Sequence, residues 1–465
     1  MTLPDPVRQW AEHQSDAPAL VTPTNVWTWA DLDARVDACA CQFERLDSHR
    51  VGVRAETQPA LVVLVLAALR ARRVLVPLST RWPRPMLTRA MTRLGLASLI
   101  AEDEIEDVDT ISLHEITQPD GVLREWEPLH LDASFTLIHT SGSTGEPKAA
   151  LHTVGNHVAS AEGLIQRFLL GPGDRWLLNL PLYHVGGLAV VFRCALAGAT
   201  MVLPEPAMST AEAVRQLQPT HASLVSTQLI RLLEENVALA SLQLVLLGGS
   251  AFPSGVLDAA EALGLPIVMS YGMTEMTSTI TSSSLPVERN ALATSGTVLP
   301  RRELRISDVG EIDVRGPTLF SGYVEGDGLR RPVDAEGWFA TGDRGTIDAD
   351  GRLIVHGRVG NGFVSGGENI QPEAIEAALA ALRGVARAVV VPVPDAEFGA
   401  RPVAFVQSTG TAIQANELAN ALRATLPGFM VPVAFLQWDG PSGLKPDRTA
   451  LAEVASSTLE NPQGG

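Results

Sequence analysis

The stretch SFTLIHTSGSTGEPK, from Ser134 to Lys148, joins an apolar run to a loop of hydroxyl groups, glycines and one lysine. The apolar half, with its aromatic and β-branched residues, predicts a buried strand. In the loop, glycines let backbone N–H groups approach a phosphate, hydroxyl groups donate further hydrogen bonds, and the lysine supplies charge. The spacing is not the Walker pattern G-x-x-x-x-G-K-[ST]. The stretch therefore predicts a phosphate site of another kind, with a Ser/Gly-rich surface turn as the alternative.

Beyond this stretch, short apolar runs alternate with amphipathic segments. Strands are expected at 175–182, 199–204, 221–225, 242–249 and 266–272, and helices at 209–217 and 254–264. This alternation is typical of sheets covered by helices, in which ligands bind beyond the carboxyl ends of the strands. The sequence therefore predicts an α/β protein whose Gly-rich and hydroxyl-rich loops each follow a strand.

The pattern changes twice towards the C-terminal part of the chain. After Gly310, short runs separated by Gly-rich turns predict a small β-subdomain. The run GRVGNG at 357–362 predicts a flexible connection, and a compact α+β pattern follows it. We therefore expect a large N-terminal domain at 1–357, a hinge at 358–362 and a small α+β domain at 363–465.

Composition and charge limit the classes of function. The 465 residues are 46% apolar, as in globular proteins, and the formal charge of -17 argues against nucleic acid or an anionic membrane as a bulk partner. Three cysteines without C-x-x-C spacing favour a reducing compartment. The N-terminus lacks a signal-peptide pattern, and the most apolar run, 60–69, predicts a buried helix too short to span a bilayer. We therefore expect a cytoplasmic protein without a membrane span, and homo-oligomerisation is left open.

A series of motifs follows the phosphate-type loop: LPLYHVGG, LLGGS, YGMTE, TGD, GR, SGGENI and a C-terminal lysine. In this order they resemble the signatures of the adenylate-forming superfamily of acyl-CoA synthetases, nonribosomal adenylation domains and luciferases. The resemblance covers nearly the whole chain. It implies that the protein uses ATP and Mg²⁺ to join a carboxylic acid to AMP, and that coenzyme A then accepts the acyl group. It also implies that the C-terminal domain is mobile.

The resemblance assigns one set of residues to the nucleotide. Tyr271 is expected to pack on adenine, Asp343 to accept hydrogen bonds from the ribose hydroxyls, and Glu275 to help hold Mg²⁺. For YGMTE alone, the alternative is a core tyrosine and a solvated glutamate. The full expected ATP site is Thr140, Ser141, Gly142, Ser143, Thr144, Gly145, Lys148, Gly248, Gly249, Ser250, Tyr271, Gly272, Met273, Thr274, Asp343 and Arg358.

Further residues are assigned to catalysis and to coenzyme A. Thr274, Glu275 and Lys445 are expected to support adenylation, with the lysine offsetting charge that grows at the α-phosphate. His184 is expected to line or gate the acyl site and not to act as a general base, because a carboxylate substrate is already ionised. The expected lining of the pantetheine tunnel is Ser365, Gly366 and Gly367.

Two positions depart from the superfamily pattern. Leu444 is an apparent extra residue in GPSGLKPDRTAL, which puts the register around Lys445 in doubt. Gly360 stands where the family usually carries Asp or Lys at the hinge. Rotation stays feasible there, but the two domain poses are less firmly set because glycine gives freedom without preference. The neighbouring Asn361 is a candidate to share that role.

The choice of acid rests on the similarity of several sequence segments and on one residue. Segments such as YGMTEMTSTI and VPVPDAEFGARPVAF are most similar to the o-succinylbenzoate-CoA ligases of menaquinone biosynthesis. Arg193 lies in the apolar run GGLAVVFRCALAG, where a charge is unusual. It is expected to pair with the free carboxylate of a dicarboxylic acid, helped by Ser223. The alternative is that Arg193 reaches solvent or binds an internal carboxylate.

Other functions stay open at this point. One is a general medium-chain or aromatic acyl-CoA ligase, and another is a stand-alone amino-acid adenylation domain. A third, from another class, is a nucleotide-binding protein without turnover, suggested by Gly360 and the irregular lysine motif. Retention of Glu275, Asp343, Arg358 and Lys445 argues against the third. The sequence therefore favours an AMP-forming ligase that acts on o-succinylbenzoate.

Overall fold

The computed structural model describes residues 1–118, 125–140, 148–235, 239–249, 252, 254–286, 288–326, 328–408, 414–438 and 447–460. Several residues assigned from the sequence lie outside these ranges. They are Ser141, Gly142, Ser143, Thr144 and Gly145 of the phosphate-type loop, Ser250, and Lys445 with its neighbour Leu444.

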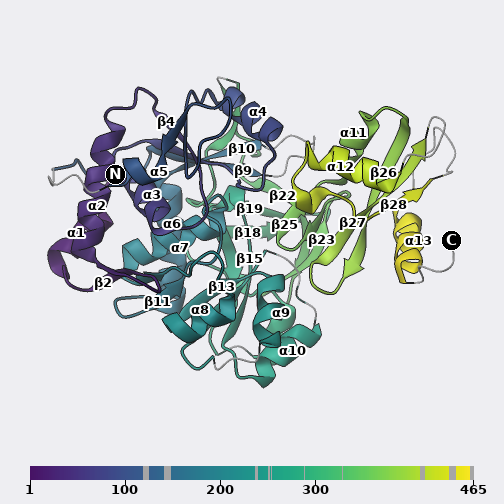
Figure 1. The fold of residues 1–465 in the computed structure, drawn as a ribbon. Helices are drawn as coiled ribbons and strands as arrows, with labels where there is room; N and C mark the ends of the chain where they lie inside the picture. Colours follow the sequence, from purple (N-terminus) through teal and green to yellow (C-terminus); the bar gives the residue numbers. More distant parts are fainter. Residues whose placement is uncertain are drawn as a thin grey trace.

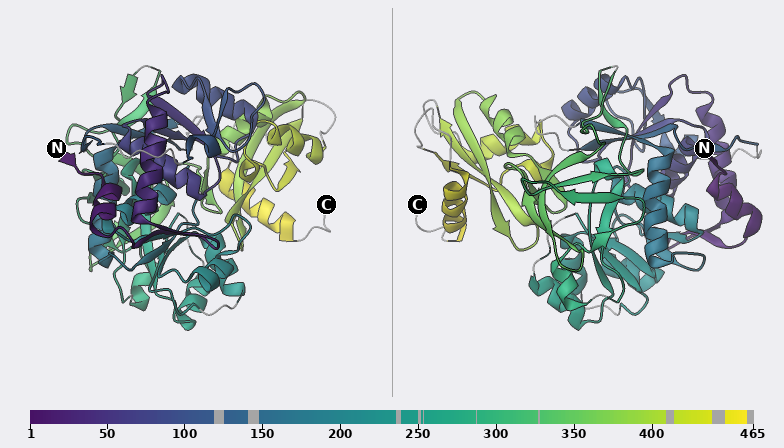
Figure 2. Two further views of the ribbon diagram at one scale, coloured as in Figure 1. Left: turned by 60° about the vertical axis from the view of Figure 1, so that its left-hand side comes forward. Right: turned by 180° about the vertical axis from the view of Figure 1, so that it is seen from behind.

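The described chain forms a large lobe and a small one (Figures 1 and 2). The large lobe contains two extended sheets. The first has the strand order β21 (Gly328–Arg330), β20 (Gly322–Glu325), β10 (Lys148–Thr153), β9 (Ser134–Thr140), β5 (Val74–Pro77), β4 (Arg50–Arg54), β6 (Leu99–Ala101) and β7 (Thr110–Ser112). The second has the order β17 (Thr297–Val298), β16 (Ser278–Ser282), β15 (Ile267–Met273), β14 (Leu244–Leu247), β13 (His221–Leu224), β11 (Arg175–Leu177), β12 (Thr200–Val202), β2 (Pro18–Val21) and β3 (Val26–Thr28).

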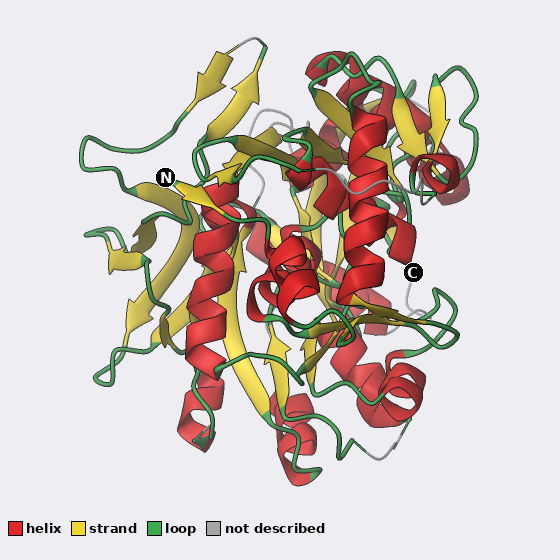
Figure 3. Cartoon of the chain, turned by 90° about the vertical axis from the view of Figure 1, so that its left-hand side faces the viewer, coloured by secondary structure: helices red, strands yellow, loops and turns green. Residues whose placement is uncertain are grey.

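Helices cover both sheets (Figure 3). They are α1 (Pro6–His13), α2 (Trp29–Phe43), α3 (Pro59–Arg70), α4 (Arg84–Leu94), α5 (Leu113–Ile116), α6 (Val154–Phe168), α7 (Val185–Ala197), α8 (Thr210–Leu217), α9 (Ser226–Glu234) and α10 (Ser254–Ala262). One apolar cluster joins the two sheets, because it contains side chains of α3, α6 and α7 together with strands of each sheet. Helix α3 is buried from Leu61 to Arg70, which explains its apolar sequence on every face.

Smaller elements complete the large lobe. The strands β1 (Thr2–Leu3) and β8 (Leu129–His130) pair near the N-terminus, and 3₁₀ turns occur at Thr274–Met276 and Arg289–Ala293. A four-stranded antiparallel sheet contains β18 (Glu303–Ile306), β19 (Glu311–Arg315), β22 (Phe339–Ile347) and β23 (Leu353–Arg358). Its register makes Asp343 of β22 the direct partner of Arg358 of β23. None of the helices in the described ranges is long and apolar enough to cross a membrane.

The small lobe follows β23 and has its own apolar core. A hairpin of β24 (Phe363–Ser365) and β25 (Glu368–Ile370) leads into α11 (Pro372–Ala380), and a three-stranded sheet contains β26 (Val385–Asp395), β27 (Gly399–Ser408) and β28 (Ala434–Gln437). The remaining elements are α12 (Ala415–Arg423), a 3₁₀ turn at Gly428–Met430 and α13 (Arg448–Glu460). The yellow-green lobe in Figure 1 is therefore a separate α+β unit packed against one side of the large lobe.

The structure confirms the α/β class, and it differs from the expected strands at 175–182 and at Gly322–Glu325. The strand expected at 175–182 ends at Leu177, ahead of Pro181, which cannot donate to a ladder. The strand expected before the phosphate-type loop is present as β9, and it pairs antiparallel with β10, which begins at Lys148. The segment Gly322–Glu325, expected in the small β-subdomain, joins β10 at the edge of the eight-stranded sheet.

Candidate functional site

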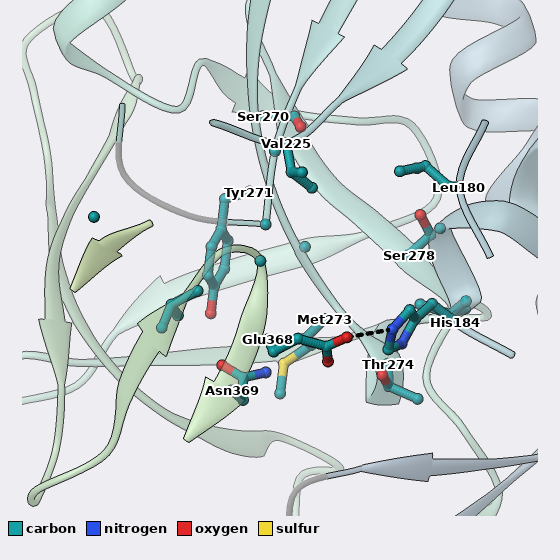
Figure 4. Close-up of a pocket in the computed structure, with 18 of the residues that line it drawn as sticks. Leu180, His184, Val225, Ser270, Tyr271, Met273, Thr274, Ser278, Glu368 and Asn369 are labelled. Carbon is teal, nitrogen blue, oxygen red and sulfur yellow. Dashed lines mark hydrogen bonds and ion pairs between the residues drawn. The ribbon is translucent and has the colours of Figure 1, made fainter. Parts of the chain in front are cut away.

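A cavity of about 1070 Å³ lies between the two lobes. The end of β15, the residues after β14 and the start of α7 contribute its large-lobe wall, and residues of β24, β25 and α11 contribute the opposite wall. Figure 4 shows Tyr271, Met273 and Thr274 of the large lobe facing Glu368 and Asn369 of the small lobe. The residues assigned from the sequence that line this cavity are Thr140, His184, Arg193, Ser223, Gly248, Gly249, Tyr271, Gly272, Met273, Thr274, Glu275, Asp343, Arg358 and Gly367.

Three of these residues form a hydrogen-bonded group. The Tyr271 hydroxyl donates to Asp343 Oδ2 at 2.7 Å, and Arg358 Nε donates to Asp343 Oδ1 at 2.9 Å. Burial and the carboxylate of Asp343 raise the pKa of Tyr271 well above its usual value, so the phenol keeps its proton. These hydrogen bonds hold the Tyr271 ring beside the Asp343 carboxylate, near the C-terminal end of β15. A purine-ribose unit needs these two features side by side.

Thr274 and Glu275 lie in the 3₁₀ turn that follows β15. Glu275 is 7% exposed, and its Oε1 accepts a hydrogen bond from the Tyr323 hydroxyl at 2.6 Å. Lys148 lies nearby, with its Nζ 5.2 Å from the centroid of the Tyr323 ring. Burial raises the pKa of Glu275, although Arg358 and Lys148 act in the opposite direction. A cation beside this carboxylate would therefore stabilise its ionised form.

The donor set fits a metal ion that is bound largely by phosphate. No group of three or more His, Cys, Asp or Glu side chains in the described ranges could hold a metal ion by itself. Mg²⁺ usually keeps several waters and takes one or two carboxylates together with substrate phosphates. Glu275 supplies one buried carboxylate beside the lysine, which fits a Mg²⁺-nucleotide and not an all-protein metal site.

Arg193 of α7 lines the cavity and is buried, with one nitrogen of its guanidinium unsatisfied. Its Nε donates to Ala189 O at 3.0 Å within the same helix, and its Nη1 has no hydrogen-bond partner. The side chain is 1% exposed, and no Asp or Glu in the described ranges forms an ion pair with it. Burial lowers the pKa of Arg193 to about 10, which still leaves it protonated at neutral pH. Arg193 is therefore a buried charge with an unused donor, Nη1, on the wall of the cavity.

Trp176 of β11 contacts both Arg193 and Ser223, and nothing in the sequence marked it as a site residue. The Arg193 guanidinium lies 4.4 Å from the centroid of the Trp176 ring, and the indole Nε1 donates to Ser223 Oγ at 3.2 Å. Trp176 is fully buried. Its position in an apolar run predicts only a core side chain, so no sequence signal separates this role from packing.

Glu368 of the small lobe reaches into the large lobe (Figure 4). Its Oε1 lies 3.1 Å from His184 Nε2 and accepts a hydrogen bond from Arg81 Nη1 at 3.0 Å. Burial would raise the pKa of Glu368, but His184 and Arg81 overcome this and hold it below its usual value. The charged residue inside the Gly-rich motif SGGENI was the available signal for Glu368, whereas nothing in the sequence indicated Arg81.

The loop before Glu368 approaches the large lobe closely. Gly367 has φ of 86°, and an added Cβ would lie 3.1 Å from Val225 Cγ1, so this position has little room for a side chain. Ser365 is buried in β24, and Gly366 packs on Phe398. These two residues, like Lys148, are not among those that line the cavity.

The expected hinge runs from Arg358, the last residue of β23, to Gly360, which has a positive φ. Arg358 is paired with Asp343, whereas Gly360 has φ of 98°, a conformation that disfavours Asp or Lys. Asn361 Nδ2 donates to Glu373 Oε1 of α11 at 2.6 Å, so the next residue is already attached to the small lobe.

Comparison with known proteins gives consistent matches over the whole chain. A family model described as AMP-binding enzyme matches residues 7–324, and one described as AMP-binding enzyme C-terminal domain matches residues 374–440. The 2-succinylbenzoate–CoA ligase of Salmonella typhimurium is 38% identical, with 99% of this chain and 100% of that protein covered.

Two solved structures of the o-succinylbenzoate CoA synthetase of Bacillus subtilis are informative together. A double mutant bound to the product analogue OSB-NCoA has a TM-score of 0.89 at 28% identity, covering 97% of this chain and 99% of that one. The complex with the acyl-adenylate intermediate OSB-AMP has a TM-score of 0.73 at 28% identity, covering 99% of each chain.

Proposed function

We infer that this chain, which belongs to the AMP-binding enzyme family, is an AMP-forming ligase that converts o-succinylbenzoate to o-succinylbenzoyl-CoA. The observation that carries the choice of acid is the buried Arg193, whose Nη1 has no partner and which lines the same cavity as Tyr271, Thr274 and Glu275. The Salmonella typhimurium relative, which is 38% identical over nearly its whole length, is named for this reaction.

In the first step, a substrate carboxylate oxygen attacks the α-phosphorus of ATP and pyrophosphate leaves. We propose that Tyr271 packs on adenine, Asp343 accepts hydrogen bonds from the ribose, and the Thr274 hydroxyl donates to the α-phosphate. Glu275 and Lys148 would flank the phosphates, where bound Mg²⁺ supplies charge neutralisation. Lys445 lies outside the described residues, and its part in this step stays a prediction from the sequence.

The acid would be oriented by its second carboxylate. Arg193 presents a guanidinium with an unused Nη1, and Ser223 presents a hydroxyl held by Trp176. A bidentate carboxylate satisfies both, because guanidinium and carboxylate match in geometry and charge. This leaves the other carboxylate of o-succinylbenzoate free to face the nucleotide. A monocarboxylic acid would leave the buried Arg193 without a charged partner.

In the second step, the thiol of coenzyme A attacks the acyl carbonyl and AMP leaves. We propose that the structure has the lobe arrangement used in this step. It matches the Bacillus subtilis enzyme better with a CoA product analogue, at a TM-score of 0.89, than with the acyl-adenylate, at 0.73. Sequence identity is 28% in both comparisons, and a different arrangement of the two lobes in the two complexes would account for the difference in TM-score. Glu368 and Gly367 make their contacts with the large lobe in this arrangement.

Glu368→Gln is expected to slow thioester formation from supplied acyl-AMP and coenzyme A by about fivefold to thirtyfold, because the Glu368 carboxylate, whose side chain is only 14% exposed, exchanges charge-assisted hydrogen bonds for neutral ones. Adenylation should stay within about twofold. Stopped-flow assays of the two half-reactions measure this. Glu397→Gln is the matched control: Glu397 also joins the lobes, through Arg231 at 3.0 Å, but both side chains are exposed, and such pairs contribute little. Equal slowing in both variants would contradict the role of Glu368.

The reaction itself is tested by its products. Wild-type protein given o-succinylbenzoate, Mg²⁺-ATP and coenzyme A is expected to release AMP and pyrophosphate in equal amounts with the thioester, measured by chromatography. Release of ADP and phosphate would contradict an acyl-adenylate route. We place the reaction in the cytoplasm, a proposal supported by Cys39, Cys41 and Cys194, which form no disulfide bond in the part of the chain that the structure describes.

A further inference from the structure

Three buried polar side chains form a chain beneath the turn that carries Thr274 and Glu275. Thr136 Oγ1 of β9 lies 2.8 Å from His157 Nε2 of α6 and 3.4 Å from His152 Nδ1 of β10. His152 Nε2 in turn lies 2.8 Å from the Thr274 carbonyl oxygen. The two histidines and Thr136 are each at most 1% exposed. Neither histidine lines the cavity, so neither can touch a substrate.

The contacts are consistent with one set of proton positions. A carbonyl oxygen only accepts, so His152 Nε2 must be the donor to Thr274 O. In a neutral ring His152 Nδ1 is then an acceptor, and the Thr136 hydroxyl donates a hydrogen bond to it. Thr136 Oγ1 is free to accept from His157 Nε2, and His157 Nδ1, which has no partner, is left as a bare acceptor. Burial lowers the pKa of His152 to about 4 and that of His157 well below its usual value, which is consistent with neutral rings.

The turn that receives this hydrogen bond has an unusual backbone. Thr277 and Ser278 follow it with φ of 54° and 95°, a conformation that non-glycine residues rarely adopt twice in succession. The Thr274 carbonyl accepts from two donors, Thr277 N at 2.9 Å and His152 Nε2 at 2.8 Å. The hydrogen bond from His152 therefore ties the eight-stranded sheet directly to the residue whose hydroxyl faces the cavity.

Aromatic rings surround these polar groups. His157 stacks on Phe192 with ring centroids 4.5 Å apart and lies edge-on to Phe135, while His152 neighbours Phe320. An aliphatic side chain would fill this aromatic layer without the desolvation cost of an imidazole. Phe192 also precedes Arg193 in α7, so the layer runs from the acid end of the cavity to the Thr274 turn.

We propose that His152 is a positioning residue for adenylation, and that Thr136 and His157 set its tautomer so that Nε2 always donates to the Thr274 carbonyl. The donor holds the turn in the conformation that aims the Thr274 hydroxyl and the Glu275 carboxylate into the cavity. This inference rests on the proposed function, in which these two groups face the phosphates. It concerns the first half-reaction and leaves transfer to coenzyme A unaffected.

The test compares two substitutions of the same histidine. His152→Met fills the space and has no donor, and it should lower the rate of o-succinylbenzoate-dependent ATP–pyrophosphate exchange at saturating substrates by about tenfold to a hundredfold, because small misplacements of reacting groups have effects of this size. His152→Gln keeps an N–H at the distance of Nε2 and should restore exchange to within about threefold of wild type. Thioester formation from supplied acyl-AMP should change less than about threefold in both variants.

The same pair of variants separates positioning from packing. If Met and Gln reduce exchange equally, or if both half-reactions fall together as they would with less folded protein, the inference is wrong. Thr136→Val replaces only a hydroxyl group with a methyl group. We expect it to slow exchange by about threefold to tenfold without slowing thioester formation. This variant tests the inference if His152→Met does not fold. If the wild type shows exchange and the Thr136 and His152 variants exchange at the same rate, this inference alone is wrong. If the wild type shows no exchange, the proposed function is wrong.

Discussion

Arg193→Met should lower kcat/KM for o-succinylbenzoate by about thirtyfold to several thousandfold, the equivalent of about 2 to 5 kcal/mol for loss of one partner of a desolvated charge pair. The thermal midpoint should not fall. In the free protein the guanidinium is buried, and no Asp or Glu in the described ranges pairs with it, so an apolar side chain of similar length removes an uncompensated charge. Steady-state kinetics and thermal unfolding of the same preparation measure both effects.

The control for Arg193→Met is the substrate itself. A monocarboxylic analogue that lacks the second carboxylate should be affected by less than about threefold, because it never used the guanidinium. Equal losses with both acids, or a wild type that prefers the monocarboxylic acid, would assign Arg193 to structure and favour a general acyl-CoA ligase.

Asp343→Asn should lower kcat/KM for ATP by about thirtyfold to a thousandfold, or about 2 to 4 kcal/mol. The carboxylate accepts from Tyr271 at one oxygen and from Arg358 at the other, and an amide can keep only one of these acceptors. The remaining NH₂ faces a donor, and the paired acceptor proposed for the ribose is lost as well. The expected effect is mainly on the KM for ATP, measured at saturating o-succinylbenzoate.

Asp313→Asn is the matched control for Asp343→Asn. Asp313 lies in the same four-stranded sheet, is 7% exposed as Asp343 is, and pairs with Arg305 at 3.0 Å, but it does not line the cavity. It should lower stability without changing the KM for ATP by more than about twofold. If both variants raise this KM alike, Asp343 acts through the sheet and not through the nucleotide.

The sequence predicted the positions of the helices and strands better than it predicted which strands pair. Strand β14 was predictable because a central parallel strand buried on both faces reads as a continuous apolar run, LVLL. The pairing of β10 with β20 was not predictable, because the two strands lie far apart in the chain and the residue pattern of each does not identify the strand it pairs with. The sequence therefore placed the loop at Ser141 after a strand but did not show that another strand follows it.

The candidate site shows the same division. Motif residues such as Tyr271 and Asp343 were predictable as site residues, and the structure brings them within hydrogen-bond distance although the chain separates them widely. Trp176 was not predictable, because a buried indole in an apolar run has the same pattern whether it packs or orients Arg193. The contact of Glu368 with His184 depends on how two lobes meet, which no local pattern encodes. The roles assigned to all these residues stay predictions until they are measured.

ATP–pyrophosphate exchange by the wild-type protein tests the central claim most directly. Labelled pyrophosphate is supplied with Mg²⁺-ATP and one acid at a time, without coenzyme A, so only formation of an acyl-adenylate can move label into ATP. We predict rapid exchange with o-succinylbenzoate and exchange at least about thirtyfold slower with benzoate or medium-chain fatty acids, which cannot pair with Arg193. Equal or faster exchange with the monocarboxylic acids would contradict the proposed substrate, and no exchange with any acid would contradict the adenylate-forming reaction.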